Sequence, residues 1–547
     1  MLFNSYIFLL CFFPVSILGY YVLGRARTPT GAKVWLAIAS FVFYGWWNPG
    51  YVILLLVSVA VNFSLGILIV DAEEKPNRQR WLLTVGVVLN LSALVYYKYL
   101  FVVLEFFHLH GFISRDFALV ILPLGISFFT FTQIGFLVDC QQGMVKDKNL
   151  LDYTLFVTFF PHLIAGPILH HREIMPQFAD RSTFQFDSRK VAAGLTLFGF
   201  GLIKKVLFAD SIAPWAESGF GHPGDLGMAV SWSTMLAYSM QLYFDFSGYS
   251  DMAVGLGAMF GVRLPLNFNS PYKSASIIEF WQRWHMTLTR YLTLLIYNPI
   301  SLWITRRRLR KGRSINRNAQ HTIEGFASLV AVPTFTTMFL AGIWHGAGLQ
   351  FIVWGVLHAL YLITNHAWRI FGPKTKESGQ DSRRGKVSVL WRVVLTYASV
   401  LLAQVFFRSA SIPDALSMLA GAAGLHGYDF PLSVAGFRLD RYGAVGEFLY
   451  RHGVIVLSST HMLWDTVTKP LIVNSALIVA FCLVVWGAPN SVQILDGFSP
   501  ALQKVEQTRW RLALWKPNFA WASGLGVIIF FVLTKLDAPG RFLYFQF

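Results

Sequence analysis

Long apolar runs separated by short polar loops dominate the chain, and this pattern predicts membrane-spanning helices. The runs over residues 6–23, 81–97 and 471–486 approach the roughly 20 residues that a helix needs to cross a bilayer. We count about ten to twelve such runs, and some are too short or too interrupted to cross completely. The pattern therefore predicts an all-α integral membrane protein with re-entrant segments, which enter and leave the membrane on one side.

The composition supports the same class of protein. Hydrophobic residues make up 55% of the chain and charged residues 13%, whereas about a quarter of the residues in a soluble domain are charged. Basic residues, which give a net charge of +17, concentrate in short loops that orient membrane helices, so we expect no nucleic-acid binding. Cys11, Cys140 and Cys482 lie far apart and form no CxxC pair, so we expect no disulfide framework and no metal site.

Basic loops predict which side of the membrane each helix end faces. Basic residues follow the first run at 25–33 and the third at 75–80, which places both loops in the cytoplasm and the N-terminus outside. The strongest basic loop, 306–313, and a polar loop at 374–386 are then also cytoplasmic, so the two helices between them form a hairpin that points outward. The first run has no basic flank before it and no cleavage site, so we interpret it as a retained helix.

Two stretches interrupt this regular alternation. Residues 154–169 are apolar but short, and Pro161 and Gly166 interrupt them. Irregular backbone persists in a membrane only where protein or a water-filled cavity satisfies it, so we expect this re-entrant segment to line a cavity. Residues 408–464 show weak apolar periodicity, and we expect them to form an excursion at the extracytoplasmic face or the membrane surface.

The domain organisation is expected to be simple, because the sequence shows no internal repeat, low-complexity linker or separable soluble domain. We expect one domain over residues 1–547, with a core at about 118–370 and C-terminal helices at about 390–547.

The first candidate for chemistry is His345, which stands in the sequence GIWHGAG between apolar runs at 322–341 and 349–367. Ionisable groups inside membranes are rare and usually functional. Neighbouring glycines lack a Cβ atom, so a substrate or another backbone can approach the imidazole closely. The alternative is a histidine that caps a helix turn in the protein core.

A second group of candidates lies at 280–289, where Arg283 and His285 stand among aromatic residues. A lone cation at mid-membrane costs roughly 2.5 to 3.5 kcal/mol, so we expect Arg283 to pair with Asp245 or Asp251 or to reach water. The alternative is a belt of aromatic residues at the membrane surface, from which an arginine extends to water.

A third group lies at 241–251, where hydroxyl and carboxylate side chains alternate with aromatic rings. These polar groups are expected to line a tunnel. Residues 124–131 have a similar composition, although a packing face of small residues explains that segment better when it is taken alone.

Taken together, these segments resemble the membrane-bound O-acyltransferase (MBOAT) family, in the branch that contains the bacterial alginate O-acetylation protein. The resemblance covers nearly the whole chain. The segments that carry it are LPLGISFFTF from Leu122, PHLIAGPI from Pro161, YFDFSGYSDMA from Tyr243, FWQRWHMTLT from Phe280, GIWHGAG from Gly342, WGVLHA from Trp354, APNS from Ala488 and the final FLYFQF.

The resemblance implies an MBOAT-like helical bundle with a central tunnel, in which His345 is the catalytic residue and His285 the second active-site position. His345 is expected to act as a general base, while His285 polarises the thioester carbonyl or orients the acceptor and Arg283 stabilises developing negative charge. An acyl-enzyme intermediate is an alternative to direct transfer. The expected tunnel residues are Trp344, Arg283, Trp284, Trp281, Tyr243, Asp245 and Ser247.

The resemblance also implies the reaction. We expect acetyl groups to pass from a cytoplasmic thioester, acetyl-CoA, across the bacterial inner membrane to an exported polysaccharide such as alginate, with an extracytoplasmic acetyltransferase as partner and no tightly bound cofactor. Residues 290–299 depart from the family pattern, which leaves the donor and the partner open. The alternatives are peptidoglycan O-acetylation, D-alanyl transfer to teichoic acid, and a transporter with a His/Asp/Arg relay, although transporters often contain internal repeats.

Overall fold

The computed structural model describes residues 1–100, 122–145, 147–373, 382–427, 469–505, 508, 510, 513–536 and 542–543. Across these residues the regular secondary structure is helical, apart from an isolated bridge between Leu264 and Ala501. The all-α prediction is therefore confirmed.

Within the described residues, 6 helices are long and apolar enough to cross a membrane, fewer than the apolar runs counted in the sequence. Several runs instead form shorter apolar helices or helices broken inside the protein. The long helices are Gly50–Asp71, Pro76–Lys98, Ser188–Gly221, Ile323–His345, Ser388–Arg408 and Pro470–Gly487, and the shorter ones are Phe8–Gly24, Thr30–Gly45 and Phe519–Leu533.

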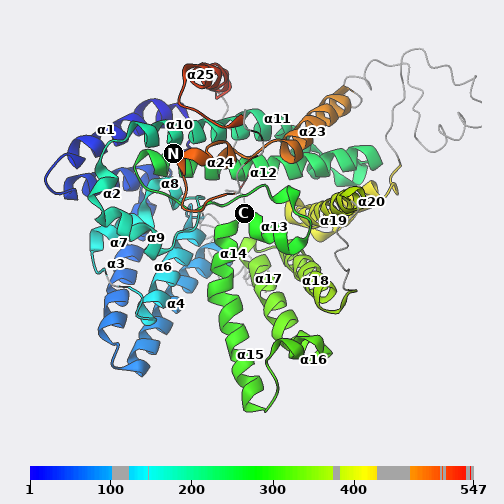
Figure 1. Ribbon diagram of the computed structural model, residues 1–547, viewed down its shortest axis with the longest axis horizontal. Coiled ribbons are helices and arrows are strands. Elements are labelled where there is room, and N and C mark those ends of the chain that lie inside the picture. The colour runs from blue at the N-terminus through cyan, green and yellow to red at the C-terminus, as the bar shows by residue number, and fades with distance from the viewer. Residues whose placement is uncertain are drawn as a thin grey trace, which may run out of the picture.

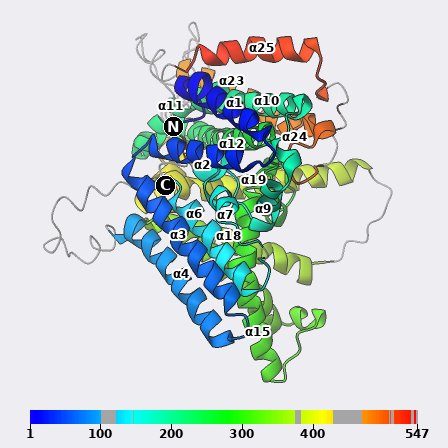
Figure 2. The same cartoon turned by 90° about the vertical axis from the view of Figure 1, so that its left-hand side faces the viewer.

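The N-terminal third begins with a π-helical turn and regular helices. They are η1 (Phe8–Phe12), α1 (Phe13–Gly24), α2 (Thr30–Gly45), α3 (Gly50–Asp71) and α4 (Pro76–Lys98). Helices α3 and α4 form a hairpin whose centre is joined by reciprocal amide hydrogen bonds between Asn62 and Asn90, at 2.6 and 3.3 Å. The hairpin packs against α6 (Ile126–Gln141), and its far end projects beyond that helix (Figures 1 and 2).

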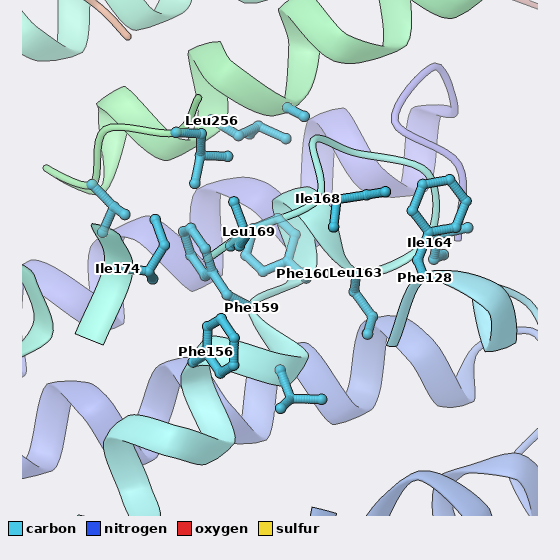
Figure 3. Packing of buried hydrophobic residues seen from close by; sticks show 14 of the residues in the cluster. Phe128, Phe156, Phe159, Phe160, Leu163, Ile164, Ile168, Leu169, Ile174 and Leu256 are labelled. Atoms are coloured by element: carbon cyan, nitrogen blue, oxygen red, sulfur yellow. The ribbon is translucent and has the colours of Figure 1, made fainter. Parts of the chain in front are cut away.

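The predicted break in residues 154–169 is present. The elements around it are α6 (Ile126–Gln141), α7 (Leu150–Thr158), α8 (Phe160–Leu163) and α9 (His171–Ala179). The chain between α8 and α9 is not helical, yet it is buried, and its apolar side chains pack with those of the flanking helices (Figure 3). A Cβ atom on Gly166 would lie 2.9 Å from the carbonyl oxygen of Pro161, so this fold-back needs a glycine.

Helix α12 (Met228–Met259) is buried along most of its 32 residues, a length of about 48 Å. It runs beside α10 (Ser188–Ile203), η5 (Lys204–Ala209) and α11 (Asp210–Gly221), across the direction of the helices below it (Figure 1). The close contact between α10 and α12 depends on glycines, since a Cβ atom on Gly201 of α10 would lie 2.5 Å from the carbonyl oxygen of Gly248 of α12.

Helices α17 (Val332–His345) and α18 (Leu349–Phe371) form the hairpin predicted around His345. The central elements before them are α13 (Ile277–Arg283), α14 (Met286–Leu292), η8 (Thr293–Tyr297), α15 (Asn298–Arg310), α16 (Ile323–Phe326) and η10 (Ala327–Ala331). Gly342 and Gly355 meet where α17 and α18 cross. The basic run at 306–313 is not wholly a loop, because α15 continues to Arg310 and Arg308 pairs with Glu324 at 2.8 Å.

The C-terminal helices are α19 (Ser382–Arg408), α20 (Ile412–Ala422), α23 (Lys469–Gly487), α24 (Ser491–Ile494) and α25 (Phe519–Leu533). Helix α25 lies along the outside of the molecule (Figure 2). Residues 374–381 of the predicted polar loop and 428–468 of the predicted excursion lie outside the described residues.

The buried side chains form two large clusters. One cluster includes Trp344, and the other includes Trp284 and Trp354. The candidate active site lies at the boundary between them.

Candidate active site

His345 is the last residue of α17, and its ring is buried among aromatic side chains. The centroid of the ring lies 4.7 Å from that of Trp344, 4.8 Å from that of Trp354 and 5.1 Å from that of Phe407. The close approach that the flanking glycines permit is made by the protein itself. A Cβ atom on Gly346 would overlap the ring of Phe351, and one on Gly342 would lie 2.5 Å from the carbonyl oxygen of the same residue.

The end of α4 holds the C-terminus of α17 in place. The amine of Lys98 donates to the carbonyl oxygens of Trp344 at 2.6 Å and His345 at 3.0 Å, and the hydroxyl of Tyr99 donates to that of Ile343 at 2.7 Å. The last carbonyls of a helix lack partners within the helix and attract cations. The motifs did not predict this arrangement, although a lysine directly after the apolar run at 81–97 was a signal that could have indicated it.

His285 separates α13 from α14 and has a left-handed backbone, with φ of 44°. This conformation is uncommon for a residue other than glycine and persists only where the surroundings impose it. Here the backbone N–H of Met286 donates to the carbonyl of Asn267 at 2.9 Å, and that of Asn269 donates to the carbonyl of Arg283 at 2.9 Å. These bonds fix the turn that buries the His285 ring.

Asn267 determines which ring nitrogen of His285 carries the proton. Its amide nitrogen donates to the hydroxyl of Ser250 at 3.3 Å, and its amide oxygen accepts from the hydroxyl of Thr287 at 2.9 Å. This assignment makes the amide oxygen an acceptor for Nδ1 of His285, 2.9 Å away. A neutral His285 is then protonated on Nδ1, and Nε2 is its basic nitrogen.

One small cavity brings three histidines together. Its volume of ≈ 40 Å³ has room for a few water molecules. The third, His358, was part of the WGVLHA motif but was not predicted as a site residue; its Nδ1 accepts a hydrogen bond of 3.3 Å from the indole of Trp281. The residues that line the cavity are Leu242, Phe246, Phe280, Trp281, Trp284, His285, Leu288, His345, Trp354, His358, Val400, Gln404 and Phe407.

The predicted tunnel residues occupy different places. Trp281 and Trp284 line the cavity, together with both candidate histidines. Tyr243 is not among the residues that line the cavity, but its ring packs near that of Trp284, with centroids 6.4 Å apart. Trp344 stacks on Phe131 of α6 at 5.2 Å.

The polar residues of the predicted tunnel lie elsewhere. Arg283 pairs with Glu279 at 2.8 Å, one turn earlier in α13, so the expected pairing with Asp245 or Asp251 is wrong. Its side chain is 29% exposed, which agrees with the other expectation, a route to water. The side chain of Ser247 is buried, and its hydroxyl has no hydrogen-bond partner among the described residues.

Both carboxylates of α12 pair with lysines of η5 instead. Asp251 lies 2.5 Å from Lys204. Asp245 lies 2.5 Å from Lys205 and accepts a hydrogen bond of 3.0 Å from the backbone of Leu543. The sequence pattern did not indicate which neighbouring helix these aspartates contact.

In the region that departs from the family pattern, Arg290 binds Glu173 of α9 with both ends of its guanidinium group, at 2.5 and 2.9 Å. A bidentate pair of this kind has a defined geometry. It connects α14, which follows His285, to the start of α9.

The bundle of long apolar helices defines a polytopic integral membrane protein with buried histidines around an internal cavity. The family model for the membrane-bound O-acyltransferase family, MBOAT, matches residues 141–315. A peptidoglycan O-acetyltransferase of Helicobacter pylori is 36% identical over 88% of this chain and 89% of its own length. The chain belongs to the membrane-bound O-acyltransferase family and is an acyltransferase.

Other relatives carry different names. A probable alginate O-acetylase of Azotobacter vinelandii is 38% identical over 77% of each chain. A teichoic acid D-alanyltransferase of Streptococcus thermophilus is 26% identical over 52% of this chain and 68% of its own length. The resemblance that the motifs indicated is confirmed.

Proposed function

We propose that this acyltransferase passes acetyl groups from a cytoplasmic thioester, acetyl-CoA, across the bacterial inner membrane for O-acetylation of an exported polysaccharide. The observation that carries the proposal is that His285 and His345 line the same cavity. An extracytoplasmic acetyltransferase completes transfer to the polymer, and the N-terminus faces the periplasm.

In the proposed reaction a first acceptor takes the acetyl group from the thioester, before the partner acetyltransferase completes transfer to the polymer. The hydroxyl oxygen of this first acceptor attacks the carbonyl carbon of the thioester. A C–O bond forms, the C–S bond breaks, and the proton of the hydroxyl passes through His345 to the departing thiolate. Proton transfer by a positioned side chain contributes roughly 10²- to 10⁴-fold to the rate. The Lys98 contact fixes the backbone that carries this imidazole.

The hydrogen bond to Asn267 separates the two roles considered for His285. With Nδ1 donating to Asn267, Nε2 of the neutral ring has no proton to donate to a thioester carbonyl. It accepts a hydrogen bond instead, so we propose that His285 orients the acceptor hydroxyl. Arg283 is not among the residues that line the cavity, and its pairing with Glu279 gives no support to a role in stabilising negative charge there.

The cavity supports an acetyl group over a D-alanyl group. A D-alanyl group carries an ammonium ion, whose burial is costly without a partner of opposite charge. The cavity has no carboxylate among its lining residues in the described part of the chain. An acetyl group is neutral and smaller.

Peptidoglycan is the second candidate for the final acceptor. The observation that favours it is the 36% identity to the Helicobacter pylori peptidoglycan O-acetyltransferase, which covers 88% of this chain. Both candidates need the same transmembrane acetyl transfer.

The test is to delete the gene, restore it as wild type or His345→Ala, and measure the acetate that mild alkali releases from purified exopolysaccharide and from purified peptidoglycan. We expect acetate to be lost from the exopolysaccharide and restored by the wild type alone. Loss from peptidoglycan alone would assign the second candidate. Unchanged acetate in both polymers would overturn the proposal.

A further inference from the structure

A group of potential metal ligands lies outside the candidate active site, where α6 meets α9. Asp139 stands near the end of α6, His170 directly precedes α9, and His171 is its first residue. One carboxylate oxygen of Asp139, Oδ2, lies 3.1 Å from Nε2 of His170 and 2.8 Å from Nδ1 of His171. One donor atom from each residue lies within 4.8 Å of the other two.

The contact between Asp139 and His171 is short but is not a hydrogen bond. Nδ1 of His171 is buried and has no hydrogen-bond partner among the described residues, although the carboxylate oxygen is only 2.8 Å away. His171 is 6% exposed and Asp139 is 5% exposed, so both side chains are largely shielded from solvent. A buried polar atom without a partner is costly. An ion bound by this nitrogen and by the carboxylate oxygen would supply the partner that Nδ1 lacks.

We propose that Asp139, His170 and His171 bind a divalent transition metal ion, with Zn²⁺ as the best match. Two imidazoles and one carboxylate form a ligand set that suits Zn²⁺. Zinc–ligand distances of roughly 2.0–2.2 Å place tetrahedral donor atoms about 3.3 Å apart. The observed separations of 2.8 and 3.1 Å reach this value through small side-chain rotations.

The surroundings leave room for a fourth ligand. A separate cavity of ≈ 330 Å³ reaches His171 and is also lined by Met144, Asp147 and Arg172. Sites with three protein ligands bind water or a small anion in the fourth position. Glu173, the nearest further carboxylate on α9, is engaged by Arg290 and stays with that partner.

The metal would join α6 to α9 across the break that α7 and α8 contain. It would therefore fix the chain on both sides of the buried irregular segment, away from the cavity lined by His285 and His345. The prediction that the chain has no metal site was based on cysteine spacing. Cysteine spacing does not reveal a site made of one aspartate and a pair of adjacent histidines that lies elsewhere in the sequence.

The test uses the full chain, purified in detergent through an affinity tag without histidines. The protein is loaded with Zn²⁺ or Co²⁺, passed through a desalting column and assayed for bound metal by mass spectrometry. Co²⁺ also reports ligand geometry through its visible absorption. We expect equimolar metal in the wild type and background levels in Asp139→Asn and His171→Gln.

His222→Gln is the matched control, because His222 is exposed at the end of α11 and belongs to no group of potential metal ligands among the described residues. We expect this variant to keep its metal. Size-exclusion profiles and thermal unfolding with and without Zn²⁺ show whether each variant is folded. Absence of equimolar metal from the wild type overturns the proposal whatever the variants do, and so does metal that folded Asp139→Asn retains.

Discussion

The amine of Lys98 donates a hydrogen bond of 3.0 Å to the backbone carbonyl of His345. The same amine donates to the carbonyl of Trp344 at 2.6 Å, so one cation at the end of α4 binds the last turn of α17. The candidate base is thereby fixed by a helix that begins more than 250 residues earlier in the chain, at Pro76.

Lys98→Met should lower the rate of acyl transfer by roughly tenfold, because a small displacement of the imidazole disrupts a geometry on which the rate depends strongly. Lys98→Arg keeps the positive charge and should restore part of the activity. Steady-state kinetics on purified protein check this, alongside thermal unfolding. If activity falls only as much as the folded fraction, Lys98 is structural and does not position the base.

His345→Ala should lower acyl transfer by at least roughly 10²- to 10⁴-fold while the protein stays inserted and folded. The measurement is turnover with acetyl-CoA and the partner acetyltransferase present. His222→Ala, at an exposed histidine, is the control for the loss of an imidazole. Near wild-type turnover of folded His345→Ala would remove His345 as the base and return attention to a transport function.

Asn267→Ala should impair turnover nearly as much as His285→Ala, because the His285 ring loses the acceptor that fixes its tautomer. Asn269→Ala is a matched control. Its amide oxygen accepts a hydrogen bond of 3.0 Å from Asn490, and no bond between its side chain and His285 occurs in the described residues. Equal effects of the two asparagine variants would indicate that the loop, and not the tautomer, controls activity.

Lys205→Met should destabilise the protein by roughly 3–5 kcal/mol, since removal of one partner leaves a buried charge uncompensated. Lys205 lies 2.5 Å from Asp245 and 2.8 Å from Asp210. The double variant Lys205→Met/Asp245→Leu should recover part of the loss in a double-mutant cycle of unfolding measurements. Additive losses would show that Lys205 and Asp245 are not coupled.

Cysteines placed at Arg310 or Lys374 should resist an impermeant thiol reagent in intact cells and react after permeabilisation, because basic segments next to membrane helices stay in the cytoplasm. Cys11 is exposed, so the experiment needs a Cys11→Ser background. Labelling from outside would reverse the predicted topology.

The sequence was sufficient for the parts of the fold that depend on apolar length. The hairpin around His345 and the break near Pro161 follow from the lengths of the runs and the positions of glycine and proline. The sequence did not show that α12 is buried by protein, because hydropathy is similar for helices that face lipid and helices that face other helices.

The candidate site was predictable only in part, for a similar reason. The motifs identified His285 and His345, but the contacts that orient them come from Lys98 and Asn267, which lie in other segments. The prediction that Arg283 pairs with Asp245 or Asp251 was wrong, because the pattern of charges in a sequence does not show which side chain of a neighbouring element each charge contacts.

The hydrogen bond from the backbone of Leu543 to Asp245 has a consequence for how the protein is made. The two residues are separated by 298 positions, so at typical synthesis rates the ribosome needs roughly 15 to 60 s to reach Leu543 after Asp245 has been built. During that interval Asp245 has Lys205 but lacks the Leu543 donor, and the contacts of α12 with α19, α20 and α23 are still being added. We therefore expect the insertion machinery or membrane chaperones to protect α12 until Leu543 is in place.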